Sequence, residues 1–282
     1  MIIWIASYPK SGNTWVRSLL SYYFFSKNEK FSFDLLKHIP NFNVSDFLDK
    51  NTHIKSNDDI IKSWLPVQKF INSKFQKNLL FKTHNICTTN DGKNFTNREM
   101  SAGCIYVVRD PRNIITSYKN FENQTYEDII KNMFNENSFL LSNKSTFKKF
   151  GIKGIELISS WARHYNSWVH NKQKIPICLI KYEDLLENAD FEFRKIFNFL
   201  KKINKEKDTV IDKERLTKTI DETSFDNLKN LEENTGFSEK QNRGVDFFNQ
   251  GSKNNWKQIL PIKYSSKIEI KFSKEMKELG YL

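Results

Sequence analysis

The chain has 282 residues, of which 38% are hydrophobic and 14% are aromatic, so it can bury a large core and is not expected to be disordered. No apolar stretch approaches the length of a membrane span. The formal charge of +12 indicates an anionic partner, but it leaves nucleic acid, a polyphosphorylated nucleotide and an anionic membrane equally open.

The cysteines and the N-terminal segment predict the cellular location of the protein. Cys87, Cys104 and Cys178 lack Cys-x-x-Cys spacing, and their odd number leaves one thiol unpaired in any disulfide scheme. The apolar run after Met1 has no basic residues before it, and Lys10 interrupts it too early for a signal peptide. We therefore expect a cytoplasmic protein without a targeting segment.

Strand-like and helix-like patterns alternate along the chain. Strands are expected at 2–6, 78–82, 104–108 and 175–181. Helices are expected at 13–26, 57–74, 111–121, 154–171, 190–202 and 262–279. This alternation predicts an α/β fold with a central, mostly parallel sheet flanked by helices, and we expect a single domain over residues 1–282. The weakly periodic segments 27–56, 136–153 and 236–256 are typical of functional loops.

The first strand runs into the sequence Ser-Tyr-Pro-Lys-Ser-Gly-Asn-Thr-Trp, residues 7–15. Gly12 permits a tight turn before a helix that starts near Asn13. A helix N-terminus presents backbone N–H groups and partial positive charge, to which Lys10 adds a full charge. The pattern predicts a P-loop-like site for a phosphate or a sulfate.

A second strand, at 104–108, also runs into a helix through a basic turn. Arg109 stands at the strand end, and Ser117 follows two helical turns later. The guanidinium and the hydroxyl can approach one anion from two directions, although an ordinary capping pair between Arg109 and Asp110 is an alternative. Two such sites suit a ligand with two separated phosphate groups.

In these two motifs the chain resembles sulfotransferases that use 3′-phosphoadenosine 5′-phosphosulfate (PAPS) and release adenosine 3′,5′-bisphosphate (PAP). The run Tyr8-Pro9-Lys10-Ser11-Gly12-Asn13-Thr14-Trp15 resembles the 5′-phosphosulfate loop of that family, with Asn13 where Thr is frequent, and Arg109 to Ser117 resembles its 3′-phosphate segment. The resemblance implies transfer of a sulfuryl group to a hydroxyl or amine, without a metal. It also implies that Lys10 and the backbone of Ser11, Gly12, Asn13, Thr14 and Trp15 hold the 5′-phosphosulfate, that Trp15 stacks on adenine, and that Arg109 and Ser117 bind the 3′-phosphate.

Lys82-Thr83-His84 resembles the Lys-Thr-His segment of the same family. Lys82 and His84 share one face of the strand because strand side chains alternate. The resemblance implies that His84 is the general base and that Lys82 stabilises charge on the sulfuryl group. It also implies that Lys10 balances charge on the leaving phosphate and that Ser117 holds Lys10 back until an acceptor arrives. The remaining histidines, His38, His53, His164 and His170, are expected to be structural.

Two later segments extend the resemblance. Tyr182, in Tyr-Glu-Asp-Leu, is expected to contact adenine or, alternatively, to pack at a helix start. Gly251, Trp256 and Lys257 match a C-terminal nucleotide motif, but Asn249 and Gln250 stand where that motif has Arg and Lys. These amides can donate hydrogen bonds to the nucleotide; either Arg243 or Lys253 supplies the missing charge, or donor affinity is weaker than usual. The dimer motif of the family is absent, with Pro261-Ile262 where Thr-Val is usual, so the oligomeric state stays open.

Two other classes of function compete with this interpretation. A P-loop kinase or NTPase would need a Gly-x-x-x-x-Gly spacing before Lys10 and a clear magnesium ligand, and the sequence shows neither. A non-catalytic binder of anions or nucleic acid fits the charge and predicts salt-dependent binding without adenosine specificity. We expect no nucleic-acid partner and a small-molecule or carbohydrate acceptor. The acceptor pocket is expected in the irregular segments, whose phenylalanines fit an apolar acceptor or simply anchor the loops.

Overall fold

The fold is seen in a computed structural model that describes residues 1–27, 30–122, 124–141, 144–240, 246–248, 251 and 254–282. Contacts divide the chain into two compact units. Unit 1 comprises Met1–Tyr8, Pro40–Tyr106 and Asn135–Leu179, and unit 2 comprises Pro9–Ile39, Val107–Phe134 and Ile180–Leu282. The prediction of one domain stays a prediction.

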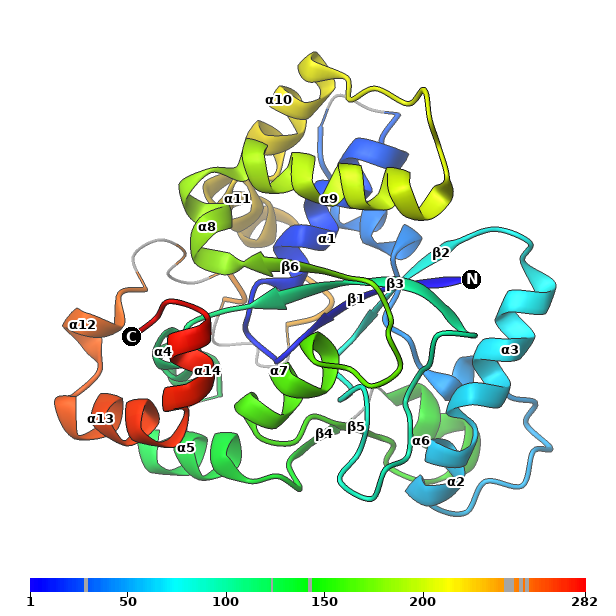
Figure 1. Cartoon of the computed structure of the whole chain (residues 1–282), viewed down its shortest axis with the longest axis horizontal. Helices are drawn as coiled ribbons and strands as arrows, with labels where there is room; N and C mark the ends of the chain where they lie inside the picture. The colour runs from blue at the N-terminus through cyan, green and yellow to red at the C-terminus, as the bar shows by residue number, and fades with distance from the viewer. Residues whose placement is uncertain (28–29, 123, 142–143, 241–245, 249–250, 252–253) are drawn as a thin grey trace. The chain divides into compact units, whose positions relative to one another are not determined.

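The central sheet has four strands in the order β2-β1-β3-β6 (Figure 1). The strands are β1 (Ile2–Ser7), β2 (Leu79–Thr83), β3 (Ser101–Val108) and β6 (Ile177–Lys181). β1 and β2 are parallel, with Ile2 opposite Leu79 and Ala6 opposite Thr83. Every residue of β1 and β3 is buried, as their continuous apolar runs predict for strands covered on both faces. The predicted α/β fold with a central parallel sheet is confirmed.

Unit 1 packs its core around the indole of Trp4. The Trp4 ring lies against Phe42 and Phe95, with centroids 5.0 and 4.9 Å away, and its Nε1–H donates to Ser101 Oγ at 2.7 Å. The other elements of this unit are η2 (Val44–Asp46), α2 (Asn57–Lys62), α3 (Trp64–Lys74), β4 (Phe139–Leu141), α6 (Lys144–Phe150), β5 (Ile155–Leu157) and α7 (Trp161–Val169). β4 and β5 form an antiparallel pair.

Unit 2 contains the helices that follow β1, β3 and β6 in the chain. One group of neighbours is α1 (Asn13–Phe25), α8 (Tyr182–Glu187), α9 (Ala189–Asn204), α10 (Lys213–Glu222) and α11 (Phe225–Thr235), with η1 (Phe33–His38) beside α1. The other is α4 (Pro111–Glu122), α5 (Tyr126–Phe134), α12 (Trp256–Ile259), α13 (Ile262–Lys271) and α14 (Ser273–Glu278) (Figure 1).

Three predicted helices differ from the observed ones. The helix predicted at 57–74 is two helices that meet at Ser63, and the helix predicted at 262–279 is interrupted at Phe272. The prediction of one helix over 154–171 is wrong, because residues 155–157 pair with β4 and the helix begins only at Trp161. Ser160 caps that helix by accepting a hydrogen bond from the Arg163 backbone N–H.

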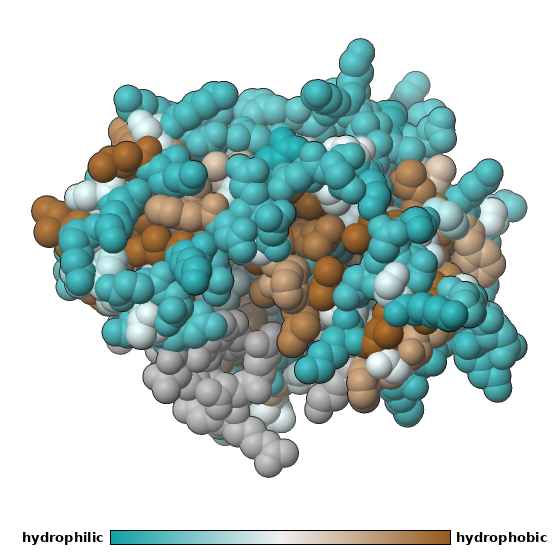
Figure 2. All heavy atoms as spheres, turned by 90° about the horizontal axis from the view of Figure 1, so that it is seen from below, coloured by the Kyte–Doolittle hydropathy of each residue, from teal (hydrophilic) through white to brown (hydrophobic). Residues whose placement is uncertain are grey.

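All three cysteines are free thiols inside the protein, and burial raises the pKa of Cys87 to about 12. In the part of the chain that the structure describes, no helix has the length and apolarity to cross a membrane, and no group of three or more His, Cys, Asp or Glu residues is arranged to bind a metal. On the face seen in Figure 2, hydrophilic residues cover most of the surface and apolar residues form patches among them. The cytoplasmic location stays a prediction.

Candidate active site

The loop between β1 and α1 makes a tight turn and ends at a helix start. Lys10 and Gly12 have positive φ angles of 64° and 99°, and α1 begins at Asn13 without a side-chain cap. Such a helix start binds anions through its backbone N–H groups. Ser11 is fully buried, and its Oγ has no hydrogen-bond partner among the described residues. These features fit a loop built around a phosphate or sulfate group.

Gly12 runs directly over the ring of Tyr182. A Cβ added at Gly12 would lie 2.4 Å from Tyr182 Cδ2, a distance that no side chain tolerates. Glycine is required here both by the positive φ and by this close approach. The sequence analysis placed both residues at the nucleotide, and the structure brings them together.

Arg109 also lies against the ring of Tyr182. Its guanidinium carbon lies 4.0 Å from the centroid of the Tyr182 ring, and its Nη1 donates to the backbone carbonyl of Lys10 at 3.1 Å. One arginine at the end of β3 thus contacts both the loop after β1 and the residue that opens α8. Burial is the main cause that raises the pKa of Tyr182, so its hydroxyl stays protonated at neutral pH.

The charge of Arg109 is poorly compensated. Arg109 is only 6% exposed, and its Nε has no hydrogen-bond partner among the described residues. No ion pair joins it to a carboxylate in the parts of the chain that the structure covers. A buried guanidinium is costly unless an anion balances it. An anionic ligand beside Arg109 would remove this cost, as the predicted 3′-phosphate would.

Trp15 and Lys10 also lie in this region of unit 2. The Trp15 ring meets Tyr182 edge to face at 5.7 Å, and its Nε1–H donates to the Thr223 carbonyl at 2.9 Å. The Nζ of Lys10 lies 4.5 Å from the centroid of the Phe247 ring, a cation–π contact. Sequence reasoning did not place Phe247 beside Lys10, because no periodicity links positions so far apart.

The other predicted nucleotide residues are only partly described. Ser117 lies two turns into α4 and is half-buried. Gly251 is buried with a φ of 51°, and a Cβ there would meet the Phe225 ring at 2.6 Å. Asn249, Gln250, Arg243 and Lys253 lie outside the described residues, so the predictions made for them stay predictions.

In unit 1, His84 follows the end of β2 and is held by β1. Its Nδ1 lies 2.8 Å from the Ser7 carbonyl oxygen and 3.3 Å from Ser7 Oγ. A carbonyl oxygen only accepts hydrogen bonds, so in the neutral ring Nδ1 carries the hydrogen and Nε2 carries the lone pair. A ring held in this tautomer has a basic atom ready to take a proton.

The segment around His84 is held by its neighbours. Lys82 pairs through its backbone, donating to the Pro40 carbonyl at 2.9 Å and accepting from the Phe42 N–H at 2.8 Å. Beyond His84, the Asn85 carbonyl accepts from Trp168 Nε1 at 2.9 Å. The backbone on both sides of His84 is therefore fixed, so the ring is presented in a defined position.

His164 supports His84 from the core, as expected for a structural histidine. It is fully buried, and its Nε2 donates to the His84 carbonyl at 3.1 Å. The Tyr106 hydroxyl then donates to His164 Nδ1 at 2.8 Å, which completes one neutral tautomer. Burial lowers the pKa of His164 to about 3, so the ring stays neutral at physiological pH.

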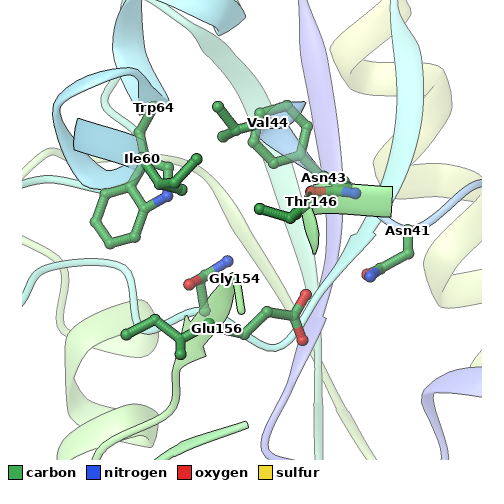
Figure 3. A pocket seen from close by; sticks show the side chains of 11 residues that line it. Asn41, Asn43, Val44, Ile60, Trp64, Thr146, Gly154 and Glu156 are labelled. Atoms are coloured by element: carbon green, nitrogen blue, oxygen red, sulfur yellow. Dashed lines mark hydrogen bonds between the residues drawn. The ribbon is translucent and has the colours of Figure 1, made fainter. Parts of the chain in front are cut away.

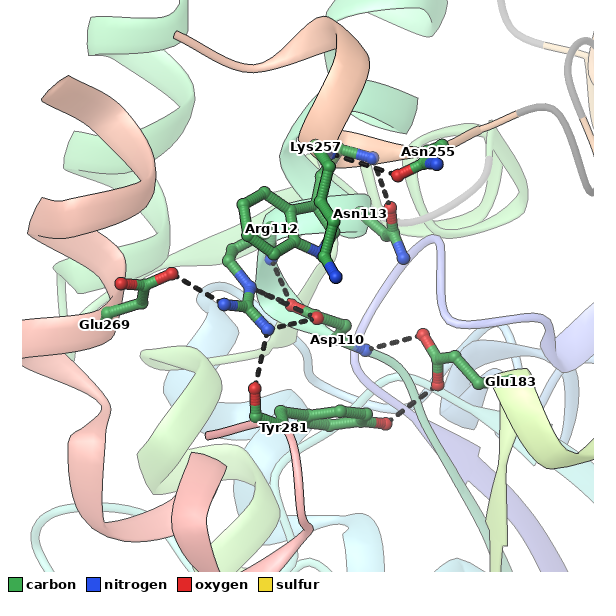
Figure 4. Close-up of polar contacts among 9 residues, drawn as sticks. Asp110, Arg112, Asn113, Glu183, Asn255, Lys257, Glu269 and Tyr281 are labelled. Carbon is green, nitrogen blue, oxygen red and sulfur yellow. Dashed lines mark hydrogen bonds and ion pairs between the residues drawn. The ribbon is translucent and has the colours of Figure 1, made fainter. Parts of the chain in front are cut away.

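Asp110 and Glu183 have partners that sequence reasoning missed. Asp110 precedes Pro111 at the start of α4, and Glu183 lies in the first turn of α8, where the helix dipole stabilises a carboxylate. The Asp110 carboxylate caps α4 by accepting from the Arg112 backbone N–H at 2.9 Å, and it also binds the Arg112 guanidinium, with 2.7 Å between Oδ2 and Nη2. The Asp110 N–H donates to Glu183 Oε1 at 3.0 Å (Figure 4). The second arginine of Arg-Asp-Pro-Arg was the available signal, because a carboxylate between two arginines can pair with either of them.

A small cavity lies next to this segment of unit 1 (Figure 3). Asn41 and Asn43 come from the irregular segment 27–56, Thr146 comes from 136–153, and Asn85 directly follows His84. The cavity measures about 20 Å³, enough for a water molecule and far below the roughly 300 Å³ of the smallest typical ligand pockets. It is too small to be the acceptor site in this form.

The predicted site residues thus form two groups. Unit 2 brings together Lys10, Gly12, Trp15, Arg109 and Tyr182. Unit 1 holds Lys82 and His84 at the end of β2. The first group has the chemistry of an anion and nucleotide site, and the second has the chemistry of a base with a neighbouring cation.

Comparison with known proteins decides between the classes of function. A family model described as a sulfotransferase domain matches residues 2–280. This chain belongs to the sulfotransferase family. The family resemblance and the enzyme class predicted from the motifs are confirmed, and the membership favours sulfuryl transfer over a kinase and over a non-catalytic binder.

The sulfotransferase is similar to named enzymes along almost its whole length. It is 24% identical over 285 residues to the amine sulfotransferase of Oryctolagus cuniculus, covering 98% of this chain and 81% of that protein. It is 26% identical over 295 residues to sulfotransferase 1 family member D1 of Mus musculus, covering 98% and 83%.

Solved structures share its fold. Mouse sulfotransferase SULT7A1 complexed with PAP aligns with a TM-score of 0.58 and 16% identity, covering 98% of this chain and 84% of that one. Retinol dehydratase in complex with androsterone and the inactive cofactor PAP aligns with a TM-score of 0.61 and 14% identity, covering 98% and 80%. At these identities the likeness concerns the fold.

Proposed function

We propose that this sulfotransferase uses PAPS to sulfate a hydroxyl or amine of a small-molecule or carbohydrate acceptor, with PAP as the second product. The observation that carries the proposal is the buried guanidinium of Arg109, which lies between the Lys10 backbone and the Tyr182 ring and whose Nε has no hydrogen-bond partner among the described residues. An anionic nucleotide would supply both the missing charge and the missing hydrogen-bond acceptor.

Donor binding is divided among the residues of unit 2. Lys10 and the backbone from Ser11 to Trp15 hold the 5′-phosphosulfate at the start of α1. Arg109 and Ser117 bind the 3′-phosphate, and Trp15 and Tyr182 contact the adenine. Asn249, Gln250 and Gly251 complete the nucleotide site in this proposal.

The donor supplies an activated sulfuryl group, so the chain has to orient the acceptor and manage charge and protons. A sulfur–oxygen bond forms to the acceptor while the bond from sulfur to the 5′-phosphate oxygen breaks, and the proton of the acceptor passes to His84 Nε2. Lys82 stabilises charge on the sulfuryl oxygens, and Lys10 balances the charge left on the phosphate. Ser117 holds Lys10 back until an acceptor is bound.

The first experiment compares two nucleotides. We expect PAP to raise the melting temperature of the protein and ATP with magnesium to leave it unchanged, because a ligand stabilises only a protein that binds it. Stabilisation by ATP with magnesium alone would favour a kinase. Binding of PAP and of unrelated polyanions with equal affinity, falling steeply with salt, would favour a non-catalytic anion binder.

The second experiment looks for transfer. Labelled PAPS is offered with separate sets of phenols, alcohols, amines and saccharides, and labelled product is separated from donor. Any acceptor that is sulfated is then tested with a His84→Ala variant. A variant with unchanged turnover would remove His84 from the mechanism.

A further inference from the structure

Arg109 and Tyr182 are each followed in the sequence by an acidic residue. Asp110 follows Arg109, and Glu183 follows Tyr182. The Asp110 backbone N–H donates to Glu183 Oε1 at 3.0 Å, which ties the two dipeptides together. The spacing between Arg109 and Tyr182 therefore depends on the position of the Glu183 carboxylate.

Tyr281 holds the other oxygen of that carboxylate. Its hydroxyl donates to Glu183 Oε2 at 2.9 Å (Figure 4). Burial and the neighbouring Glu183 raise the pKa of Tyr281 well above its usual value, so the hydroxyl keeps its proton and remains a donor. Glu183 thus accepts from the Asp110 backbone with one oxygen and from Tyr281 with the other.

A second contact of Tyr281 reaches the same turn through its backbone. The Tyr281 carbonyl accepts from Arg112 Nη2 at 2.8 Å (Figure 4). The same guanidinium binds Asp110, donates to Glu269 Oε1 at 2.6 Å, and lies 3.9 Å from the centre of the Trp256 ring. Each nitrogen of this buried guanidinium has a partner, which is the arrangement in which a buried charge is well satisfied.

The turn after α14 places Tyr281 in this position. Gly280 has a φ of 72°, its N–H donates to the Lys277 carbonyl, and the Tyr281 N–H donates to the Met276 carbonyl at 2.8 Å. This pair of hydrogen bonds is a Schellman motif, which reverses the chain at a helix end. The reversal turns Tyr281 back toward Arg112 and Glu183.

We propose that Tyr281 is a positioning residue for the donor site and acts on Arg109 and Tyr182 through Glu183 and Arg112. It lies outside every motif that the family resemblance supplied, and the inference rests on the proposed use of PAPS. Loss of the Tyr281 hydroxyl leaves Glu183 Oε2 without that donor, which loosens the carboxylate that spaces the two nucleotide-contacting residues.

The test substitutes Tyr281→Phe, which removes one hydroxyl. We expect the Kd for PAP, measured by calorimetry, and the KM for PAPS to rise by about threefold to tenfold while kcat changes little. The matched control is Tyr264→Phe, because Tyr264, on α13, also donates its hydroxyl to a carboxylate, that of Glu127. The control should lower the melting temperature and leave the Kd for PAP unchanged.

A double-mutant cycle tests the route through Glu183. If Tyr281 acts through this carboxylate, Glu183→Gln combined with Tyr281→Phe should weaken PAP binding no more than Glu183→Gln alone. Gly280→Ala is a second variant, which strains the turn that carries Tyr281 because a residue with a side chain disfavours a φ of 72°. An added Cβ there meets no described atom within 4 Å, so the strain acts through the backbone alone. Gly280→Ala should raise the Kd for PAP as Tyr281→Phe does.

The outcomes separate the two proposals. Binding of PAP to the wild type, with an unchanged Kd in Tyr281→Phe and in Gly280→Ala, would overturn the positioning role and leave the proposed function standing. A wild type that does not bind PAP at all would overturn the proposed function and this inference with it.

Discussion

The backbone at Gly12 lies against the ring of Tyr182 so closely that a Cβ would stand 2.4 Å from Cδ2. The two residues belong to different motifs in the sequence, one in the loop after β1 and the other at the start of α8. Their contact makes the loop and the aromatic residue one structural unit, and it is sensitive to a single methyl group.

Gly12→Ala should therefore destabilise the fold and abolish PAP binding. The positive φ alone costs about 1–2 kcal/mol for a residue with a side chain, and the overlap with Tyr182 adds to this cost. Gly236→Ala is the control, because Gly236 has a φ of 74° and an added Cβ there meets none of the described atoms within 4 Å. Urea unfolding and calorimetry with PAP measure the two effects. Equal losses of unfolding free energy in both variants would mean that the contact with Tyr182 has no cost.

Arg109 and Arg112 are buried to a similar extent but differ in their partners, so substitutions to Met should affect different properties of the protein. Arg109→Met should change the unfolding free energy without PAP by less than about 1 kcal/mol, because no carboxylate in the described part of the chain loses its partner. It should raise the Kd for PAP by about 30-fold or more. Arg112→Met should cost about 3–5 kcal/mol of stability, because it leaves the Asp110 carboxylate buried and unpaired.

Chemical unfolding in the absence of nucleotide separates these two variants. If Arg109→Met is as unstable as Arg112→Met, Arg109 has a structural role that its contacts do not reveal. If Arg109→Met binds PAP like the wild type, the nucleotide charge is balanced elsewhere, and the assignment of Arg109 to the 3′-phosphate fails.

His84→Asn should lower kcat by about 10²–10⁴-fold without changing the Kd for PAP. The side-chain amide that this substitution introduces is expected to keep the hydrogen bond to the Ser7 carbonyl, so the segment keeps its conformation while the basic nitrogen is lost. Single-turnover measurements with labelled PAPS give the rate of the transfer step. A rate within about threefold of the wild type would show that another group takes the proton.

The motifs near the strand ends were predictable because their signals are local. The apolar run before Tyr8 predicted β1, and Gly12 predicted the turn and the helix start at Asn13. Charge next to such a turn then predicted an anion site. Each of these inferences uses residues within a few positions of one another, where the physical preferences of the sequence act directly.

The contacts that join the motifs were not predictable from one sequence. Tyr281 and Arg112 are 169 positions apart, and no period or spacing relates them. The helix predicted at 154–171 failed for a similar reason, since pairing of β5 with β4 overrides the local pattern. Lys10 beside Phe247 is a third case, in which tertiary packing alone brings the residues together.

The pH dependence of stability should report on His164. Its pKa falls from 6.5 in the unfolded chain to about 3 in the folded protein, because burial disfavours the charged ring. Between these two values the unfolded chain binds more protons, so the unfolding free energy decreases as the pH falls below about 6.5. The slope is about 1.4 kcal/mol per pH unit, which gives about 2 kcal/mol between pH 6.5 and pH 5.

The variant His164→Gln tests this prediction. The side-chain amide that it introduces can still donate to the His84 carbonyl, and this part of the slope should disappear. Denaturant unfolding of both proteins at pH 7.5, 6 and 5 gives the comparison. Parallel curves for the two proteins would show that His164 does not resist protonation in the folded state.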